Sequence, residues 1–179
     1  MAGDIKAKFG TQGTLTFTSF NSQAGSSTFL AGSSSLAVDN TTNVALDYIV
    51  SAKITWSTTA PAAGTYRLDM HVYGSLNDTP DYPLDGSGNA LGTDVDRSFA
   101  TDGDKANSAA WWASLTLAAT ASKVYTQNPK GIALQCFGGR GSLPKYWGMW
   151  AVHGVTTASS TPASSGNTVW YMPVLAQYT

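Results

Sequence analysis

Hydrophobic and polar residues alternate with a period of two in several stretches of the chain, and this pattern predicts β-strands. The clearest stretches are residues 45–56 and 65–76. In the first, every second residue from Tyr48 onward is apolar, so one face of the strand would be buried and the other in contact with water. A turn containing Pro61 and Gly64 separates the two stretches, which predicts an antiparallel hairpin.

Further stretches have the composition of strands. Residues 14–20 alternate threonine with leucine and phenylalanine, and 108–120 favour a strand over an alanine-rich helix. Near the C-terminus, 145–155 and 167–179 are rich in aromatic residues and are joined by a polar loop that predicts a second hairpin. Pro173 lies within the last strand, and because proline has no N–H it indicates an edge strand or a bulge.

The pattern predicts an all-β fold, a single β-sandwich or jelly-roll domain of about seven or eight antiparallel strands. Residues 44–179 would form this domain. Residues 1–43 differ, because Gly- and Ser-rich stretches surround their one short strand. They are interpreted either as a flexible tail or as an extended arm that orders against a partner. Residues 77–106 form a long polar excursion whose few apolar anchors are Leu84, Leu91, Val95 and Phe99.

Composition supports the all-β prediction and excludes some functions. All eleven acidic residues are aspartate, a poor helix former, and only 12% of the residues are charged. A net charge of −1 argues against nucleic acid and against a polybasic membrane patch as partners. Cys136 is the single cysteine, which excludes an internal disulfide and a cysteine-based zinc site. With no apolar signal segment at the N-terminus, synthesis in a reducing cytoplasm is expected.

Candidate chemistry is sparse. His71 and His153 are expected on outward strand faces, where Asp69 would have to join them to form a metal site. The acidic residues 94–104 lack the order of an EF-hand calcium loop, and a solvated loop is the simpler interpretation. No G-x-S-x-G elbow is present, and the absence of glutamate removes the usual glycosidase pair. The chain is therefore expected to be no enzyme, with no catalytic, metal or cofactor residues.

The aromatic residues are better candidates for function. Trp111 and Trp112 are adjacent, so in a strand they point to opposite faces, and one indole is expected on an outer surface. The strand pattern groups Trp112 with Ser114 and Thr116, and Trp111 with the apolar residues on either side of them. Exposed aromatic side chains occur at carbohydrate platforms and at protein interfaces.

Two passages resemble a known family. Residues 72–78, Val-Tyr-Gly-Ser-Leu-Asn-Asp, with Tyr82-Pro83, resemble a V-Y-x-S-x-D-x-x-x-Y-P passage. Residues 138–148 resemble a G-G-x-x-P-x-x-W-G passage before a penultimate strand. Both are similar to marks of small virion proteins of tailed bacteriophages, over residues 44–179. The chain departs from the family at residues 153–156, which are His-Gly-Val-Thr where the family often has N-x-T-G.

The resemblance implies a structural protein of the virion, made in the host cytoplasm. Within that class, we expect a head decoration (cement) protein on the outer surface of the capsid. Its partners would be the major capsid protein and other copies of itself, as a dimer or trimer. The residues expected at interfaces are Leu15, Phe17, Phe20, Tyr82, Trp111 and Trp112. The alternatives are a glycan-binding module and a tail or neck component.

Overall fold

The computed structural model describes residues 5–42, 44–137 and 143–178. In chain order, the elements are β1 (Ile5–Phe9), β2 (Gly13–Thr14), β3 (Ala31–Ser34), β4 (Val38–Asp39), β5 (Asp47–Thr55), β6 (Gly64–Ser75), β7 (Val95–Ser98), α1 (Asp102–Ser108), β8 (Ala110–Thr116), β9 (Val124–Gly131), α2 (Ala133–Phe137), β10 (Tyr146–Val155) and β11 (Thr168–Tyr178). Seven of these strands have five residues or more.

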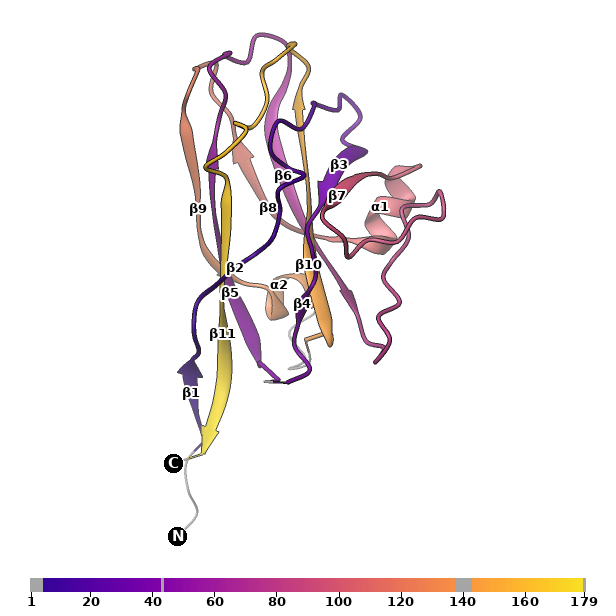
Figure 1. Ribbon diagram of the computed structural model, residues 1–179, viewed down its shortest axis with the longest axis vertical. Helices are drawn as coiled ribbons and strands as arrows, with labels where there is room; N and C mark the ends of the chain where they lie inside the picture. The colour runs from indigo at the N-terminus through magenta and orange to yellow at the C-terminus, as the bar shows by residue number, and fades with distance from the viewer. Residues whose placement is uncertain (1–4, 43, 138–142, 179) are drawn as a thin grey trace.

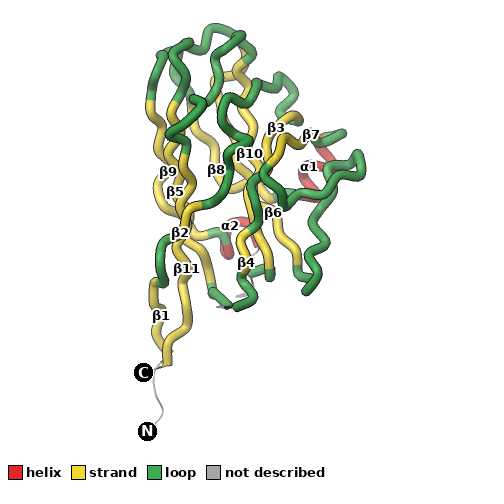
Figure 2. The backbone as a smooth tube through the Cα atoms, in the orientation of Figure 1, coloured by secondary structure: helices red, strands yellow, loops and turns green. Residues whose placement is uncertain are grey.

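The strands form two antiparallel sheets that pack face to face (Figures 1 and 2). Sheet A has the order β1-β11-β5-β9, with β2 also paired to β11. Sheet B has the order β7-β3-β10-β6-β8, with β4 also paired to β10. The predicted all-β sandwich is confirmed, whereas the jelly-roll topology stays a prediction.

The main core fills the space between the two sheets. Alternate residues of β5 pack against alternate residues of β6 and β10, which is the arrangement that the period-two pattern predicts. The Tyr48 and Trp147 rings, one from each sheet, lie with their centroids 5.0 Å apart. The buried residues contributed by these three strands are Tyr48, Val50, Ala52, Ile54, Leu68, Met70, Val72, Trp147, Met149, Ala151 and Val155.

Both predicted hairpins are wrong, although the strands themselves are correct. β5 belongs to sheet A and β6 to sheet B, so the turn between them crosses from one sheet to the other. The loop between β10 and β11 crosses in the same way. Instead β6 pairs with β10, and β5 pairs with β11. Alternation predicts that one face of a strand is buried, but it does not predict which other strand pairs with that strand.

The N-terminal segment does not form an arm separate from the sandwich. The N–H of Leu15 donates to the carbonyl of Val169 in sheet A, at 2.8 Å, and that of Ser35 donates to Met149 in sheet B, also at 2.8 Å. The segment thus passes from one sheet to the other along the side of the sandwich. A boundary at residue 43 therefore divides a chain that packs as one unit from β2 onward.

The polar excursion covers the outer face of sheet B. In the structure this segment extends to the start of β8, so from here on residues 77–109 are called the excursion. It contains β7 and α1, and Thr101 caps α1 by accepting a hydrogen bond from the N–H of Asp104. Leu91 and Phe99 are buried anchors, as predicted, and pack in a second apolar cluster with Trp150 and Val152 of β10. Leu84 and Val95, which were also expected to be anchors, are exposed instead. β10 is apolar on both faces, and because the excursion covers its outer face, both faces are buried.

Pro173 lies in the middle of sheet A, opposite a break between β1 and β2. Its carbonyl accepts a hydrogen bond from the N–H of Gly10 at 2.8 Å. In an antiparallel pair, the N–H and C=O of one residue point to the same neighbouring strand. Proline has no N–H, so at Pro173 the missing donor faces the break between β1 and β2 and no ladder hydrogen bond is lost. Of the two predicted explanations, the local irregularity is the one that the structure has.

Candidate interaction surface

Strand β11 is apolar on both faces, from Val169 to Ala176. Its inner residues, such as Val169 and Leu175, join the core between the sheets. Its outer residues Trp170, Met172 and Val174 are half-buried and remain accessible to solvent. A strand with two apolar faces is typical of a position that is covered on both sides.

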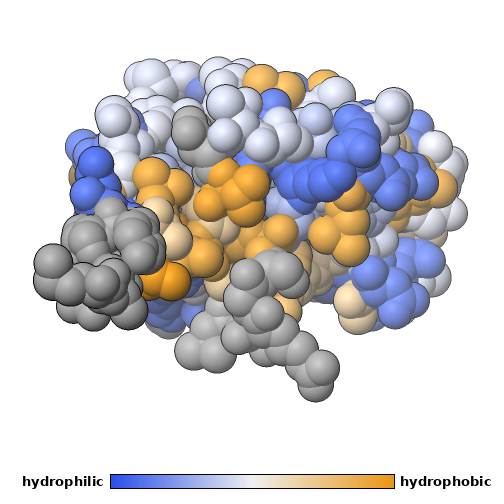
Figure 3. Space-filling view, turned by 90° about the horizontal axis from the view of Figure 1, so that it is seen from below, coloured by the Kyte–Doolittle hydropathy of each residue, from blue (hydrophilic) through white to orange (hydrophobic). Residues whose placement is uncertain are grey.

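Strand β1 extends the outer face of β11 beyond the sandwich. Phe9 pairs with Val174 and Ala7 with Ala176, so apolar residues of the two strands share one face. Ile5 and Phe9 are 75% and 62% exposed. The two strands leave the body as a ribbon at the end of the molecule where the described chain begins and ends (Figure 1). Figure 3 shows apolar atoms gathered at this end.

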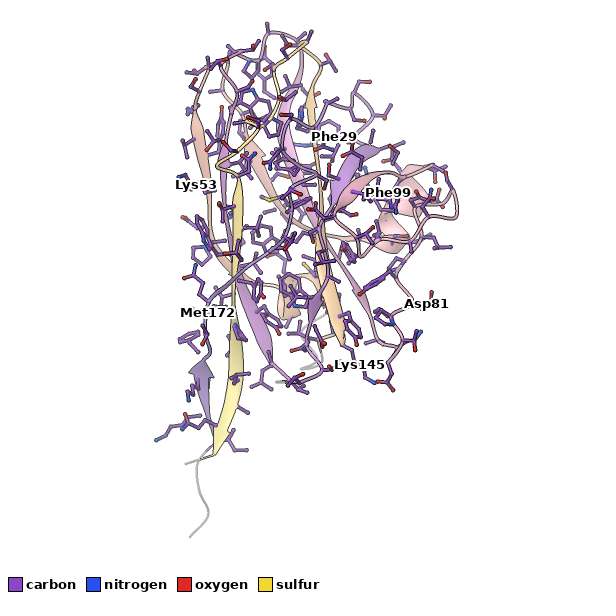
Figure 4. All side chains as sticks on the ribbon, viewed as in Figure 1. Phe29, Lys53, Asp81, Phe99, Lys145 and Met172 are labelled. Atoms are coloured by element: carbon purple, nitrogen blue, oxygen red, sulfur yellow. The ribbon has the colours of Figure 1, made fainter. Side chains whose placement is uncertain are left out.

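We call this surface the apolar face. A shallow hollow of about 190 Å³ lies on it, bordered by Ile49, Pro129, Trp170 and Met172. Lys53 adjoins it on the same side of sheet A, and Figure 4 places Lys53 and Met172 on the side that faces away from sheet B. The apolar face consists of Ile5, Ala7, Phe9, Ile49, Trp170, Met172, Val174 and Ala176.

Most of the residues expected at interfaces lie elsewhere. Leu15, Phe17, Phe20 and Trp112 are buried in the core between the sheets. Leu15, Phe17 and Phe20 pack inside the chain because the segment after β2 closes one side of the sandwich, and Trp112 points inward from β8. In this fold their side chains are not available to a partner, which corrects the expectation from sequence.

Tyr82 is half-buried at a junction between the two motifs that resemble the phage family. Its ring packs edge-on against Tyr73, at 6.2 Å, and against Tyr146, at 6.4 Å. Gly74 pairs with Trp147, and a side chain at Gly74 would collide with Pro144. The described parts of both motifs therefore meet in one packed junction, where they support the fold. The Gly138–Gly141 part lies outside the described residues.

Trp111 is the one expected interface residue with a largely exposed side chain, at 51%. A β-bulge in β8 causes this exposure, because the pairing with β6 shifts between His71↔Trp111 and Met70↔Ala113. Trp112 is the extra residue, so Trp112 and Ala113 both point into the core. One of the two indoles is exposed, as predicted. The predicted grouping is changed at the bulge, because Trp112 instead of Trp111 shares the buried face with Ala113.

The exposed indole is held by a short polar chain. Trp111 Nε1 donates to the hydroxyl of Ser114 at 3.1 Å, and Ser114 in turn donates to Asp69. The other carboxylate oxygen of Asp69 pairs with Arg67 at 2.9 Å. These contacts fix an aromatic ring above a charged pair at the edge of sheet B.

Both histidines are buried, which corrects their expected outward exposure. His71 lies under the excursion beside the Trp150 ring, at 5.4 Å. Burial lowers the pKa of His71 to about 4, although the nearby Asp69 carboxylate acts in the opposite direction. His153 lies between the sheets against Trp56, and burial also lowers its pKa. Neutral imidazoles are therefore expected at physiological pH.

The acidic residues 94–104 bind separate parts of the chain. Asp94 accepts hydrogen bonds from the backbone of Thr18 and Ser19, both at 2.8 Å. Asp96 accepts from Ser33, and Asp102 pairs with Lys105. Among the described residues, no three His, Cys, Asp or Glu side chains come close enough to hold a metal ion. Asp94 thus fastens the N-terminal segment to the excursion.

No family model matches the chain, and no curated protein or solved structure is similar to it at a significant level. In the described part of the chain, no helix is long and apolar enough to cross a membrane.

The apolar face was not identified from the sequence. Its signal is the nearly unbroken apolar run of residues 169–176, which leaves neither side of the strand polar. The alternation in 5–9 is a second signal, because it places Ile5, Ala7 and Phe9 on one side. Neither signal tells which face of the strand is covered within the chain.

Proposed function

We propose that this chain is a structural protein of a tailed-bacteriophage virion, a decoration protein that binds the assembled head shell. It acts without catalysis, on the outer surface of the capsid, by joining neighbouring copies of the major capsid protein. The sequence resemblance suggests the class, and the accessible apolar face is the observation that carries the mode of action.

The apolar face supplies the free energy for such a function. Burying a leucine-sized or phenylalanine-sized side chain contributes about 1.5–3 kcal/mol. Ile5 and Phe9 are largely exposed in the free chain, so a partner that covers them gains most of this energy. A protein that binds only the assembled shell stabilises that shell by mass action, once for each copy bound.

The ribbon of β1 and β11 adds a second means of contact. Strand β1 is the terminal strand of sheet A, and all five of its residues are exposed. A two-stranded ribbon is only marginally stable in water by itself. A partner can stabilise it by adding a strand to its edge, which requires little sequence specificity.

Co-sedimentation with head shells that lack the chain tests the proposal. Binding is expected to saturate at a fixed multiple of the capsomer number. A Phe9→Ser, Ile5→Ser double variant is expected to lose at least about tenfold in affinity. A Leu36→Ser variant is the matched control, because Leu36 is 48% exposed but lies outside the apolar face. A folded wild-type chain that does not bind shells, or a double variant that binds normally, would contradict the proposal.

A second candidate function is glycan binding at Trp111. An indole that is 51% exposed and fixed through Ser114 beside the Arg67–Asp69 pair offers a flat apolar ring with polar groups at its edge. Titration with simple sugars, followed by tryptophan fluorescence, tests this candidate. A saturable change that a Trp111→Ala variant abolishes would favour it over shell binding, and unchanged fluorescence would argue against it.

A further inference from the structure

Strand β5 places Asp47 and Lys53 on the outer face of sheet A, because the residues that alternate with them point into the core. Lys53 is exposed, and Asp47 is half-buried. The remaining lysines in the strands of this sheet pair with residues on its inner side and therefore lie on that side too, namely Lys6, Lys8 and Lys130. Among the described strand residues, the outer face thus carries one positive and one negative side chain.

The two charges lie at equal distances from one line across the strands. Lys53 follows Asp47 by six positions, which corresponds to about 20 Å along a strand. Val50 is midway between them and pairs with Tyr171 of β11. Each charge is therefore about 10 Å from a line that crosses the strands at Val50 and Tyr171. A half-turn about such a line exchanges the position of the lysine with that of the aspartate.

The centre of this surface has the composition of a protein interface. Ile49, Trp170 and Met172 lie around the central line, and all three are half-buried. The register pairs Ile49 with Met172 and Ser51 with Trp170, so apolar side chains occur on both sides of the line. Aromatic residues and methionine are enriched in the cores of interfaces, whereas charged residues are depleted there. The two charges of this surface lie outside its centre.

We propose that two copies of the chain pack against each other through the outer faces of sheet A, about a two-fold axis that crosses the strands at the level of Val50 and Tyr171. The rotation reverses the direction of the strands. Lys53 of each copy therefore faces Asp47 of the other, and each dimer contains this pair twice. The apolar centre of one copy covers that of the other and supplies the buried area.

The distances and the bonding of Asp47 allow this pair. Stacked sheets lie about 10 Å apart, so an extended lysine side chain can reach a carboxylate on the facing sheet. Asp47 Oδ1 accepts hydrogen bonds from the N–H groups of Ile132 and Ala133, at 2.9 and 2.8 Å. In the described part of the chain, the hydrogen bonds to Asp47 all end on Oδ1. Oδ2 is thus left for the lysine of the second copy.

Charge selects this arrangement over others. A two-fold axis parallel to the strands would place the Lys53 side chains of the two copies against each other, and like charges across an interface are unfavourable. In a two-fold contact the same patch occurs on both sides, so the patch must complement itself. The outer face of sheet A meets this requirement in both its charges and its apolar centre. A second copy is therefore the partner that this surface fits.

The two-fold axis also determines where the ribbons of β1 and β11 lie. Each ribbon extends beyond the Asp47 end of its own sheet (Figure 1). Because the strand direction is reversed, the two ribbons lie at opposite ends of the dimer. The use of this geometry rests on the proposed function: two ribbons would let one dimer contact two copies of the major capsid protein, as joining neighbouring copies requires.

Sedimentation velocity of the purified chain over a range of concentrations tests the inference. The wild-type chain is expected to form a dimer and no larger species, because a two-fold contact closes on itself. A Lys53→Asp variant places two pairs of like charges in each dimer and is expected to weaken association about tenfold or more. A Lys123→Asp variant is the matched control and is expected to associate like wild type, because the Lys123 ammonium lies over the ring of Tyr125, a core residue on the inner side of sheet A.

An Asp47→Lys, Lys53→Asp variant exchanges the two charges and separates charge pairing from a loss of structure. Its two copies again face each other with opposite charges, so it is expected to recover association that Lys53→Asp loses, with circular dichroism showing the variants folded. If the exchanged variant unfolds because Asp47 no longer binds Ile132 and Ala133, the comparison of Lys53→Asp with Lys123→Asp decides alone.

Four results overturn the inference. They are a wild-type chain that stays monomeric throughout the range, species larger than a dimer, a Lys53→Asp variant that associates like wild type, and a folded exchanged variant that associates no better than Lys53→Asp. Shell binding is measured separately, so either proposal can fail alone.

Discussion

The two sheets of this sandwich present similar strands to different surroundings. β10 in sheet B and β11 in sheet A are both apolar on both faces, and both pack against the opposite sheet with their inner residues. The excursion covers the outer side of β10 and buries Trp150 and Val152. The outer side of β11 remains accessible. The comparison indicates that the chain itself covers the second apolar face of β10 but leaves that of β11 accessible, where we propose that a partner covers it.

Phe99 and Phe9 give the largest test of this comparison. Phe99, 3% exposed, packs against the Trp150 ring at 4.9 Å, whereas Phe9 is 62% exposed. A Phe99→Ala variant is expected to lose about 3–5 kcal/mol of unfolding free energy, because it leaves a cavity beneath the excursion. A Phe9→Ala variant is expected to stay within about 0.5 kcal/mol of wild type. Urea unfolding measures both, and equal losses would contradict the comparison.

The pH dependence of stability tests the covered face through His71. Its pKa is about 4 in the folded chain and near the ordinary value of 6.5 when unfolded. The unfolded state therefore binds more protons between these values, and stability falls as the pH decreases from about 6.5 toward about 4. Arg67, Asp69 and Lys105 also act on His71, and His153 adds a loss of the same sign.

A His71→Gln variant separates the two histidines. It is expected to reduce the loss of unfolding free energy between pH 7 and pH 5, by an amount on the order of 1–2 kcal/mol. Urea unfolding at both pH values, with the wild-type chain alongside, gives the difference. An unchanged loss in the variant would show that His71 is not held neutral beneath the excursion.

Strand β1 gives the smallest expected effect on stability. An Ala7→Pro substitution removes a backbone N–H from β1. Because no residue of β1 is buried, the expected loss of unfolding free energy is less than about 1 kcal/mol. Shell binding is nevertheless expected to weaken, since the ribbon loses its shape. A large loss of stability in urea, with binding intact, would mean that β1 serves the fold.

The sequence predicted where the strands lie in the chain better than it predicted which strands pair with one another. Alternation identified β5 and β6, and the adjacent tryptophans identified β8, because period-two burial leaves a local record. Which strands pair depends on whether a turn stays in one sheet, and a turn such as that containing Pro61 and Gly64 can also cross to the other. The bulge in β8 adds one residue, so Trp112 points into the core and Trp111 points outward, opposite to the predicted assignment of the two tryptophans to faces.

Burial of the polar segments was the main feature that sequence reasoning missed. Gly- and Ser-rich residues before β5 indicated a tail or an arm, yet Phe20 is almost fully buried, and Asp94 fastens this segment to the excursion. His71 and His153 were expected to be exposed because their neighbours alternate. Their burial depends on segments far away in the chain, which no local pattern records.

Hydrogen exchange on the free chain and on the chain bound to head shells tests most directly whether the apolar face is the interaction surface. In the free chain, amides of β1 and of residues 174–178 are expected to exchange much faster than those of β10, whose two faces are buried. On binding, β1 and β11 are expected to gain protection. Protection gained only around Trp111, with β1 still exchanging as in the free chain, would contradict this assignment.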